Sequence, residues 1–285
     1  MEIDFQWTPV WTPDWLMKKG TCSSMPLSKK MNQLLRRIDN CSLSVKVYQR
    51  DVKIQFSPLN LPKVTKSAQR RSNIVKFSKR SARRLRFVIR NSENLWKAFV
   101  TLTYPENFPF NGRKTKKHLN AFLQYLRRKD IKFTWVLEFQ SRGAPHYHII
   151  VSGFISKDEL SRIWYRIVGS GDEKHLKAGT GIEAIKSKGH LYGYLSNYIK
   201  KLDQKTPPEG FENVGRFWGA SRNLLTFQMY QKINHYYKLA RMIKLIRRWY
   251  KAHLRQFGIK WRWRGQGFTA LDGTCLIKQL MFLKC

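Results

Sequence analysis

Cysteine, acidic side chains and long apolar runs are all scarce in this chain of 285 residues. Its four cysteines, Cys22, Cys41, Cys275 and Cys285, have no close pair spacing, which excludes both a zinc knuckle and a disulfide framework. No stretch reaches the ~18 apolar residues needed to cross a bilayer, and the N-terminus has no basic segment followed by an apolar run. We therefore expect a soluble cytoplasmic protein with reduced thiols and no stable membrane association.

The acidic residues number only 18 against 55 Lys and Arg, which gives a formal charge of +37 and a pI near 10.4. The excess is spread along the chain, with +14 in residues 1–95, +11 in residues 96–222 and +12 in residues 223–285. A polyanion, by default nucleic acid, is the expected partner. A hydrophobic fraction of 42% with 14% aromatic residues supplies a real core, which a disordered basic protein would lack.

The segment 133–151 predicts a β-hairpin. Apolar and other residues alternate over 133–139, and a second β-rich run follows the turn residues Ser141-Arg142-Gly143.

Three potential metal ligands lie in this hairpin. His146 and His148 are two residues apart and so share a face, and Glu138 joins them if the loop has an odd number of residues. Two imidazoles and one carboxylate suit a divalent ion such as Mg²⁺ or Mn²⁺ with positions open to substrate oxygens. The alternative for a His-x-His triplet alone is an ordinary surface or cross-strand pair.

A helix predicted over residues 190–202 carries the candidate nucleophile. Its residues 191, 195, 199 and 202 are aliphatic, and Tyr194, Tyr198 and Lys201 form the adjoining stripe. A close ammonium and a metal-bound phosphate both favour phenolate character, so attack on a phosphodiester would give a phosphotyrosyl intermediate. A second tyrosine one turn away could perform a second transfer. Amphipathic tyrosines on the flank of a packed helix are the alternative.

The element order predicts the fold class. Strands and helices alternate as β-α-β-β-α-β-α between residues 99 and 202, which is typical of an α+β fold with a ferredoxin-like antiparallel sheet. Lys63–Arg90 holds eleven cations and no acid, which predicts one or two basic helices. Leu225–Phe257 has apolar residues at three- and four-residue intervals, which predicts a helix or helical hairpin for core or subunit contact or, alternatively, a membrane surface.

We accordingly divide the chain into three parts. These are a basic N-terminal extension with helices (1–92), a catalytic core (93–222) and a basic helical C-terminal region (223–285).

Four segments together resemble the HUH endonuclease superfamily, specifically the rolling-circle replication initiators of small single-stranded DNA phages and plasmids. They cover roughly residues 75–225 and are Phe99-Val-Thr-Leu-Thr103-Tyr-Pro, Pro145-His146-Tyr147-His148, Tyr198-Ile-Lys-Lys201 and Gly215-Arg-Phe-Trp218-Gly-Ala-Ser-Arg222. Two positions depart from the family pattern: Tyr147 is amphipathic rather than aliphatic, and Asn197 stands where two-tyrosine members usually place a lysine.

The resemblance implies an enzyme of the HUH type that nicks an origin, becomes linked to the 5′ phosphate and leaves a 3′ hydroxyl for a host polymerase. Tyr198 would be the nucleophile and Lys201 its electrostatic partner, with Tyr194 as a less secure second nucleophile. Glu138, His146 and His148 would hold Mg²⁺ or Mn²⁺.

The expected partner is single-stranded or origin DNA, and the side chains expected to contact it are Arg142, Lys200, Arg216, Trp218 and Arg222. No Gly-x-x-x-x-Gly-Lys-Ser/Thr phosphate loop occurs, so unwinding would need a separate host helicase. Two other readings stay open. One is a relaxase or single-strand transposase with the same chemistry, and the other is a noncatalytic basic nucleic-acid-binding protein.

Overall fold

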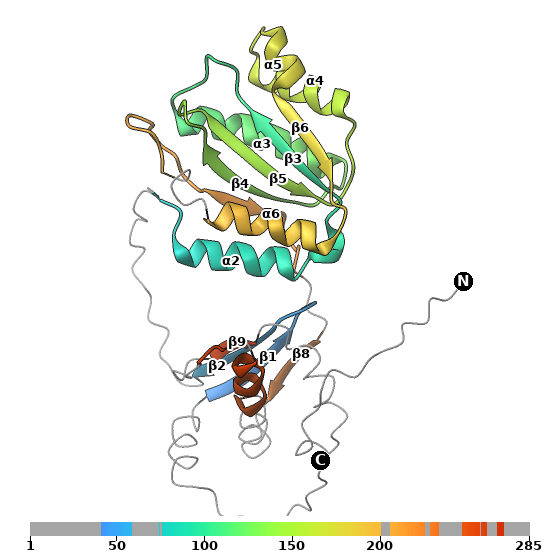
Figure 1. Ribbon diagram of the computed structural model, residues 1–285, viewed down its shortest axis with the longest axis vertical. Helices are drawn as coiled ribbons and strands as arrows, with labels where there is room; N and C mark the ends of the chain where they lie inside the picture. The colour runs from blue at the N-terminus through green and yellow to red at the C-terminus, as the bar shows by residue number, and fades with distance from the viewer. Residues whose placement is uncertain are drawn as a thin grey trace, which may run out of the picture.

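The computed structural model describes residues 41–58, 74, 76–200, 206–225, 229–233, 247–256, 258–260 and 267–270. Two antiparallel sheets carry the fold (Figure 1). The larger sheet is built from β3 (Ala98–Thr103), β4 (Phe133–Phe139), β5 (Pro145–Val151), β6 (Thr180–Ala184) and β7 (Trp218–Ala220). The helices of this part are α2 (Lys79–Arg90), the short 3₁₀ helix η2 (Glu93–Leu95), α3 (Gly112–Arg128), α4 (Lys157–Val168), α5 (Glu173–Ala178) and α6 (Lys188–Lys200).

The large sheet has the strand order β6-β3-β5-β4-β7. Its first four strands, taken with α3 between β3 and β4 and α4 before β6, have the ferredoxin-like arrangement that the element order predicts, and every pairing is antiparallel. The α+β class and the ferredoxin-like sheet are therefore confirmed. β7 adds a fifth strand next to β4, with Val136 opposite Trp218.

Helices cover both faces of this sheet. On one face α3 packs through Leu119, Phe122, Leu123 and Leu126, and the Trp164 ring of α4 meets the Phe122 ring edge to face. On the other face lie α6 and α2 (Figure 1). Because both faces are covered, all seven residues of β4 are buried.

Local signals account for the boundaries of α4. The Ser156 hydroxyl accepts a hydrogen bond from the Glu159 N–H at 3.2 Å, as the sequence predicts, and Gly169 ends the helix with φ of 65°.

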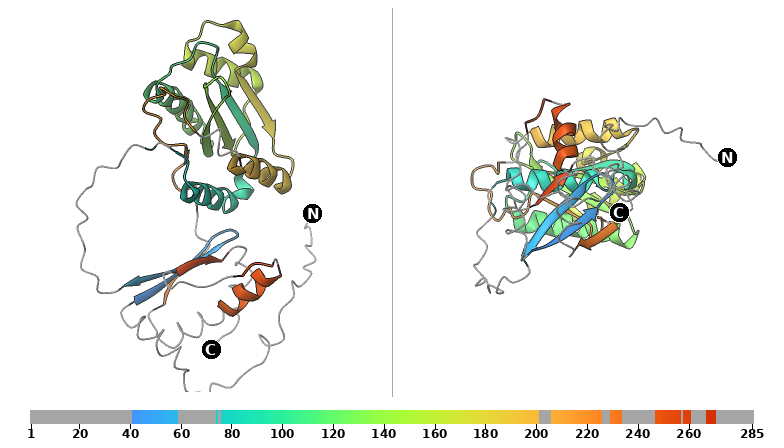
Figure 2. Two further views of the ribbon diagram at one scale, coloured as in Figure 1. Left: turned by 60° about the vertical axis from the view of Figure 1, so that its left-hand side comes forward. Right: turned by 90° about the horizontal axis from the view of Figure 1, so that it is seen from below.

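A second sheet joins the two ends of the chain. Its order is β8-β1-β2-β9, with β1 at Cys41–Val47, β2 at Val52–Pro58, β8 at Met229–Ile233 and β9 at Gly267–Ala270. Figure 2 shows the blue β1 and β2 beside the red β9. The N-terminal and C-terminal regions thus share one structural unit.

The helical prediction is wrong for these strand residues. Val52, Ile54 and Phe56 alternate with Lys53, Gln55 and Ser57, which is a strand pattern that the sequence analysis passed over. In β8, Met229 and Ile233 are four residues apart, and so short an apolar spacing fits a helix or a strand equally. The helical prediction does hold for α2 and for residues 247–255, whereas residues 59–73 and 234–246 lie outside the described part of the chain.

The β1–β2 turn is anchored to the large sheet's helical layer. Asp51, fully buried, accepts hydrogen bonds from the Asn91 side chain at 2.8 Å and from Arg90 at 3.3 Å. The Asn91 side-chain oxygen accepts in turn from the backbone N–H groups of Arg50 and Asp51. Buried polar groups are thereby paired on both sides of this contact.

Glu93 adds an ionic contact to the same junction. Its carboxylate lies 2.8 Å from the Lys188 ammonium of α6 and 3.2 Å from the Arg50 guanidinium, and it accepts a hydrogen bond from Tyr192. Burial alone would raise the pKa of Glu93, but the hydrogen bonds from Lys188 and Tyr192 and the charge of Arg50 outweigh it, so the pKa is lowered.

Candidate metal and nucleotidyl-transfer site

Glu138, His146 and His148 lie together on one face of the large sheet. Antiparallel pairing places Glu138 directly opposite His146, with five residues in the loop after Phe139, so the condition of an odd loop is met. The Glu138 Oε2 atom is 3.3 Å from His148 Nε2, and the two imidazole rings are 4.3 Å apart between centroids. Glu138 is only 4% exposed, so its carboxylate needs these partners.

This donor set has the chemistry of a divalent-metal site. Two imidazoles and one carboxylate are ligands that Mn²⁺ accepts, and all three project from neighbouring strands onto one face. Among the described residues, no three His, Cys, Asp or Glu side chains stand in a finished metal-ligand arrangement. Glu138 and His148 are in contact here, so an ion between them would require a small separation of these side chains.

Both histidines have their second ring nitrogen engaged. The Thr103 Oγ1 atom is 3.1 Å from His146 Nδ1, and the Tyr194 hydroxyl is 3.2 Å from His148 Nδ1. A histidine that binds metal through Nε2 carries its proton on Nδ1 and donates it to such a partner. The hydroxyls of Thr103 and Tyr194 would then accept, which fits a site that binds metal through both Nε2 atoms.

Thr103 is itself held from the other side of the sheet. Its carbonyl accepts hydrogen bonds from Trp164 Nε1 at 2.7 Å and from His175 Nε2 at 2.9 Å. Because His175 donates through Nε2, its Nδ1 accepts from the Ser170 hydroxyl, 2.8 Å away. His175 is buried, at 4% exposure, so one residue of β3 connects α4 and α5 to the face that carries His146.

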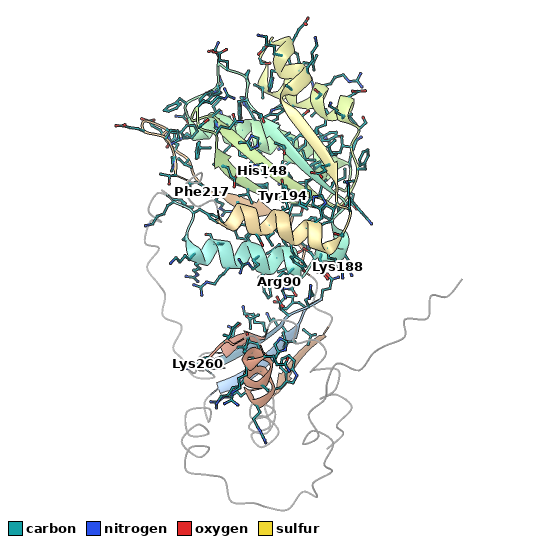
Figure 3. The ribbon with its side chains drawn as sticks, viewed as in Figure 1. Arg90, His148, Lys188, Tyr194, Phe217 and Lys260 are labelled. Atoms are coloured by element: carbon teal, nitrogen blue, oxygen red, sulfur yellow. The ribbon has the colours of Figure 1, made fainter. Side chains whose placement is uncertain are left out.

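Helix α6 lies over this face and presents Tyr194 to it. The Tyr194 ring stacks on Phe99 of β3, with centroids 3.6 Å apart and an angle of 18° between planes. Figure 3 shows Tyr194 on α6 beside His148. The predicted packing face is confirmed at Leu191 and Leu195, which are buried.

Tyr198 lies on α6 one turn after Tyr194, since four residues separate them on the helix. The side chains of Tyr198 and Lys200 lie outside the described part of the chain, as does all of Lys201. Their predicted roles therefore stay predictions.

The predicted DNA-contacting residues separate into two groups. Arg216 and Arg222 flank β7 and are exposed, and Trp218 lies within β7, partly buried. Arg142 instead donates to the carbonyls of Tyr104 at 2.6 Å and Pro105 at 2.7 Å. The structure thus gives Arg142 a role that the sequence analysis missed, in tying the β4–β5 turn to the chain that follows β3.

Thr103 and Lys116 are two further residues whose environments the sequence did not foresee. Thr103 stood in the quoted strand motif, but its contact with His146 depends on the β3–β5 register. Lys116 points from α3 at the opposite face of the sheet, with its ammonium 4.5 Å from the Trp135 ring centroid. Burial lowers the pKa of Lys116 to about 7.

Comparison with known proteins gives a family match over the core. Residues 97–203 match a family of replication-associated proteins, described by the names ORF2 and gene 2 protein. The comparison with curated proteins finds no match.

Among solved structures, the chain was compared with the N-terminal nuclease domain of non-structural protein 1 of minute virus of mice, described as having a unique Zn²⁺ coordination and a novel mode of DNA recognition at the origin of replication. The two are 8% identical, with 73% of this chain and 79% of that chain covered. The TM-score of 0.15 is too low for that likeness to bear on this chain.

Proposed function

We propose that this chain, whose residues 97–203 match the replication-associated protein family, is a metal-dependent single-strand DNA endonuclease and strand transferase that initiates rolling-circle replication. The observation that carries the proposal is the gathering of Glu138, His146 and His148 on the sheet face over which α6 lies. That arrangement puts a divalent-metal donor set next to the helix that bears Tyr198.

The reaction would use the residues as follows. A divalent ion held by Glu138, His146 and His148 would withdraw charge from the nonbridging oxygens of the scissile phosphate. The Tyr198 oxygen attacks phosphorus in line, the bond to the 3′ oxygen breaks, and the phenolic proton passes through solvent to that leaving oxygen. The products are a 5′-phosphotyrosyl bond and a free 3′ hydroxyl, which a host polymerase could extend after a host helicase has unwound the duplex.

Lys201 and Tyr194 would support this step. An ammonium one turn from Tyr198 favours the phenolate over the phenol. The Tyr194 hydroxyl is placed to orient His148, a positioning role that its 3.2 Å contact favours over the second-nucleophile role expected from the sequence.

The test is covalent capture of single-stranded DNA. Purified full-length protein is incubated with single-stranded DNA from its own replicon plus Mn²⁺, and adducts are separated on a denaturing gel. We expect an adduct that is lost in Tyr198→Phe and in His148→Ala. Tyr165→Phe on α4, a tyrosine remote from the donor set, should retain it.

The outcomes separate the rival readings. An adduct that persists in Tyr198→Phe would assign the nucleophile elsewhere. No adduct at all, with tight and salt-sensitive binding, would favour the noncatalytic binding protein. Adduct formation with transfer of a strand between unrelated origins would favour the relaxase or transposase reading.

A further inference from the structure

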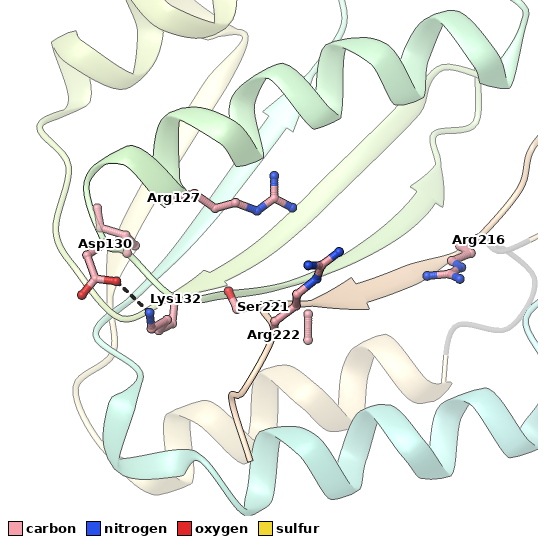
Figure 4. A pocket seen from close by; sticks show the side chains of 8 residues that line it. Arg127, Asp130, Lys132, Arg216, Ser221 and Arg222 are labelled. Atoms are coloured by element: carbon pink, nitrogen blue, oxygen red, sulfur yellow. Dashed lines mark hydrogen bonds and ion pairs between the residues drawn. The ribbon is translucent and has the colours of Figure 1, made fainter. Parts of the chain in front are cut away.

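A basic pocket lies at the β7 edge of the large sheet, apart from the candidate metal site. It has a volume of about 670 Å³ and is lined by Arg127, Asp130, Ile131, Lys132, Arg216, Ala220, Ser221 and Arg222. Figure 4 shows the guanidinium of Arg127 coming from α3, with Arg216 and Arg222 coming from the two ends of β7. Four cations thus face one space that contains a single carboxylate.

The one carboxylate is already neutralised. Asp130 lies 2.7 Å from the Lys132 ammonium, as the dashed line in Figure 4 marks. Within the described residues, no carboxylate pairs with Arg127, Arg216 or Arg222. Three guanidinium groups therefore carry uncompensated charge around the pocket.

The framework of the pocket is fixed by strand pairing. The Ser221 hydroxyl accepts from the Phe133 N–H at 2.8 Å, and the Ser221 N–H donates back to the Phe133 carbonyl at 2.9 Å. The Arg127 guanidinium lies over the Phe133 ring, 5.3 Å from its centroid. These contacts hold α3, β4 and the end of β7 together, so the cations are presented from a rigid base.

Uncompensated guanidinium groups around one cavity fit a ligand with several oxygen anions. Planar guanidinium groups bind phosphate oxygens in pairs, and the pocket offers few apolar side chains for any other class of ligand. The chain's net charge of +37 adds a long-range attraction for the same ligands.

The position of the pocket indicates which phosphates these are. Lys132 precedes Glu138 by six residues of the extended chain, which is roughly 20 Å along the strand. One nucleotide at the metal site cannot reach the pocket, whereas a longer strand can. Building on the proposed function, we infer that this pocket binds the phosphodiester backbone of the single strand whose scissile bond lies at Glu138, His146 and His148.

The experiment measures how binding of a single strand depends on salt. A strand of about 30 nucleotides, long enough to cover both places, is titrated without metal at several salt concentrations. In Arg127→Gln with Arg222→Gln, two phosphate contacts are removed, so the slope of log K against log salt should shrink by about 1.4. Affinity at low salt should fall about 10-fold or more.

The control removes the same charge elsewhere. Arg162→Gln with Arg166→Gln lowers the charge by two on exposed positions of α4 and should leave the slope nearly unchanged. An equal effect of both pairs would show diffuse charge attraction and overturn the pocket. A pocket pair that binds DNA like the wild type would overturn it too, and would direct attention to an acidic protein partner.

The same variants keep this inference separate from the proposed function. Adduct formation by the pocket pair at saturating DNA should match the wild type, because the metal ligands and Tyr198 are intact. If no variant forms an adduct but only the pocket pair loses the salt slope, the binding site stands and the nuclease proposal fails. If adducts form normally and the slopes agree, the reverse holds.

Discussion

Thr103 shows how a single residue can set the geometry of the candidate metal site. Its hydroxyl contacts His146 at 3.1 Å, and loss of such a partner typically weakens metal affinity 10- to 100-fold. Thr103→Val keeps the shape and removes the hydroxyl, so we expect weaker Mn²⁺ binding by isothermal titration calorimetry with little change in Tm.

The matched control for this prediction is Thr101→Val. Thr101 is described on the same strand and face, opposite His148, but makes no hydrogen bond to either histidine. Its substitution should leave Mn²⁺ affinity within about twofold of the wild type, since no ring partner is lost. Equal losses in the two variants would speak against the orienting role of Thr103.

Lys116 is a buried cation that destabilises the fold at neutral pH. Its Nζ finds no hydrogen-bond partner among the described residues, and only the rings of Trp135 and Tyr147 face it. We expect Lys116→Met to raise the free energy of unfolding by on the order of 3 kcal/mol near pH 6, because it removes the cost of burying the charge.

The pH dependence of that gain has a definite sign. The pKa of Lys116 is about 7 in the folded protein and 10.5 in its ordinary state, so the unfolded chain binds more protons between these values. Wild-type stability from this group therefore rises as the pH climbs from 7 to 10.5, and the advantage of Lys116→Met shrinks over the same interval. Urea unfolding at pH 6 and pH 9.5 measures it, and a constant difference would contradict the assignment.

The candidate site was predictable from sequence where strand periodicity decides. The spacing of Glu138, His146 and His148 places all three on one face once the loop is odd, and the structure has that register. The pocket's Arg127 and Lys132 could not be found in this way. They are brought to Arg216 and Arg222 only by the β4–β7 pairing, which no local pattern reveals.

At the scale of elements, the β1–β2 turn depends on one asparagine. Asn91 pairs with the buried Asp51 carboxylate and with two backbone N–H groups of the turn. Asn91→Ala would leave this carboxylate and these donors short of partners, at a cost of about 3 kcal/mol. Urea denaturation compared with Asn120→Ala, an exposed asparagine of α3, measures it. Similar costs for both variants would show that the turn is not anchored there.

The elements themselves were predicted unevenly for a physical reason. β3 to β6 and α3 to α6 have long or clearly periodic patterns, and each was expected near its observed place. The small sheet was missed because its strands come from both ends of the chain, and a dense run of Lys and Arg next to them favoured basic helices. Pairing of β1 with β8 joins residues almost 190 positions apart, and such non-local contacts leave no periodic signal.

At the scale of the whole molecule, charge dominates how the chain meets a nucleic acid. With +37 spread over all three regions, binding to any single strand should weaken steeply with salt. We expect the affinity for a random strand to fall by about 10³-fold between 50 and 200 mM salt, measured by fluorescence anisotropy. A weak dependence would mean that few of these cations contact phosphates. No helix of the described part of the chain is long and apolar enough to cross a membrane.

The double hold on the Thr103 carbonyl makes the catalytic face sensitive to its own back side. His175 and Trp164 lie behind the sheet, yet through this carbonyl they fix the residue that orients His146. In a mutational survey His175 would therefore score as if it belonged to the active site, although it touches neither metal ligand nor DNA. Loss of activity there would travel through the sheet as a misplaced hydroxyl, with the protein still folded.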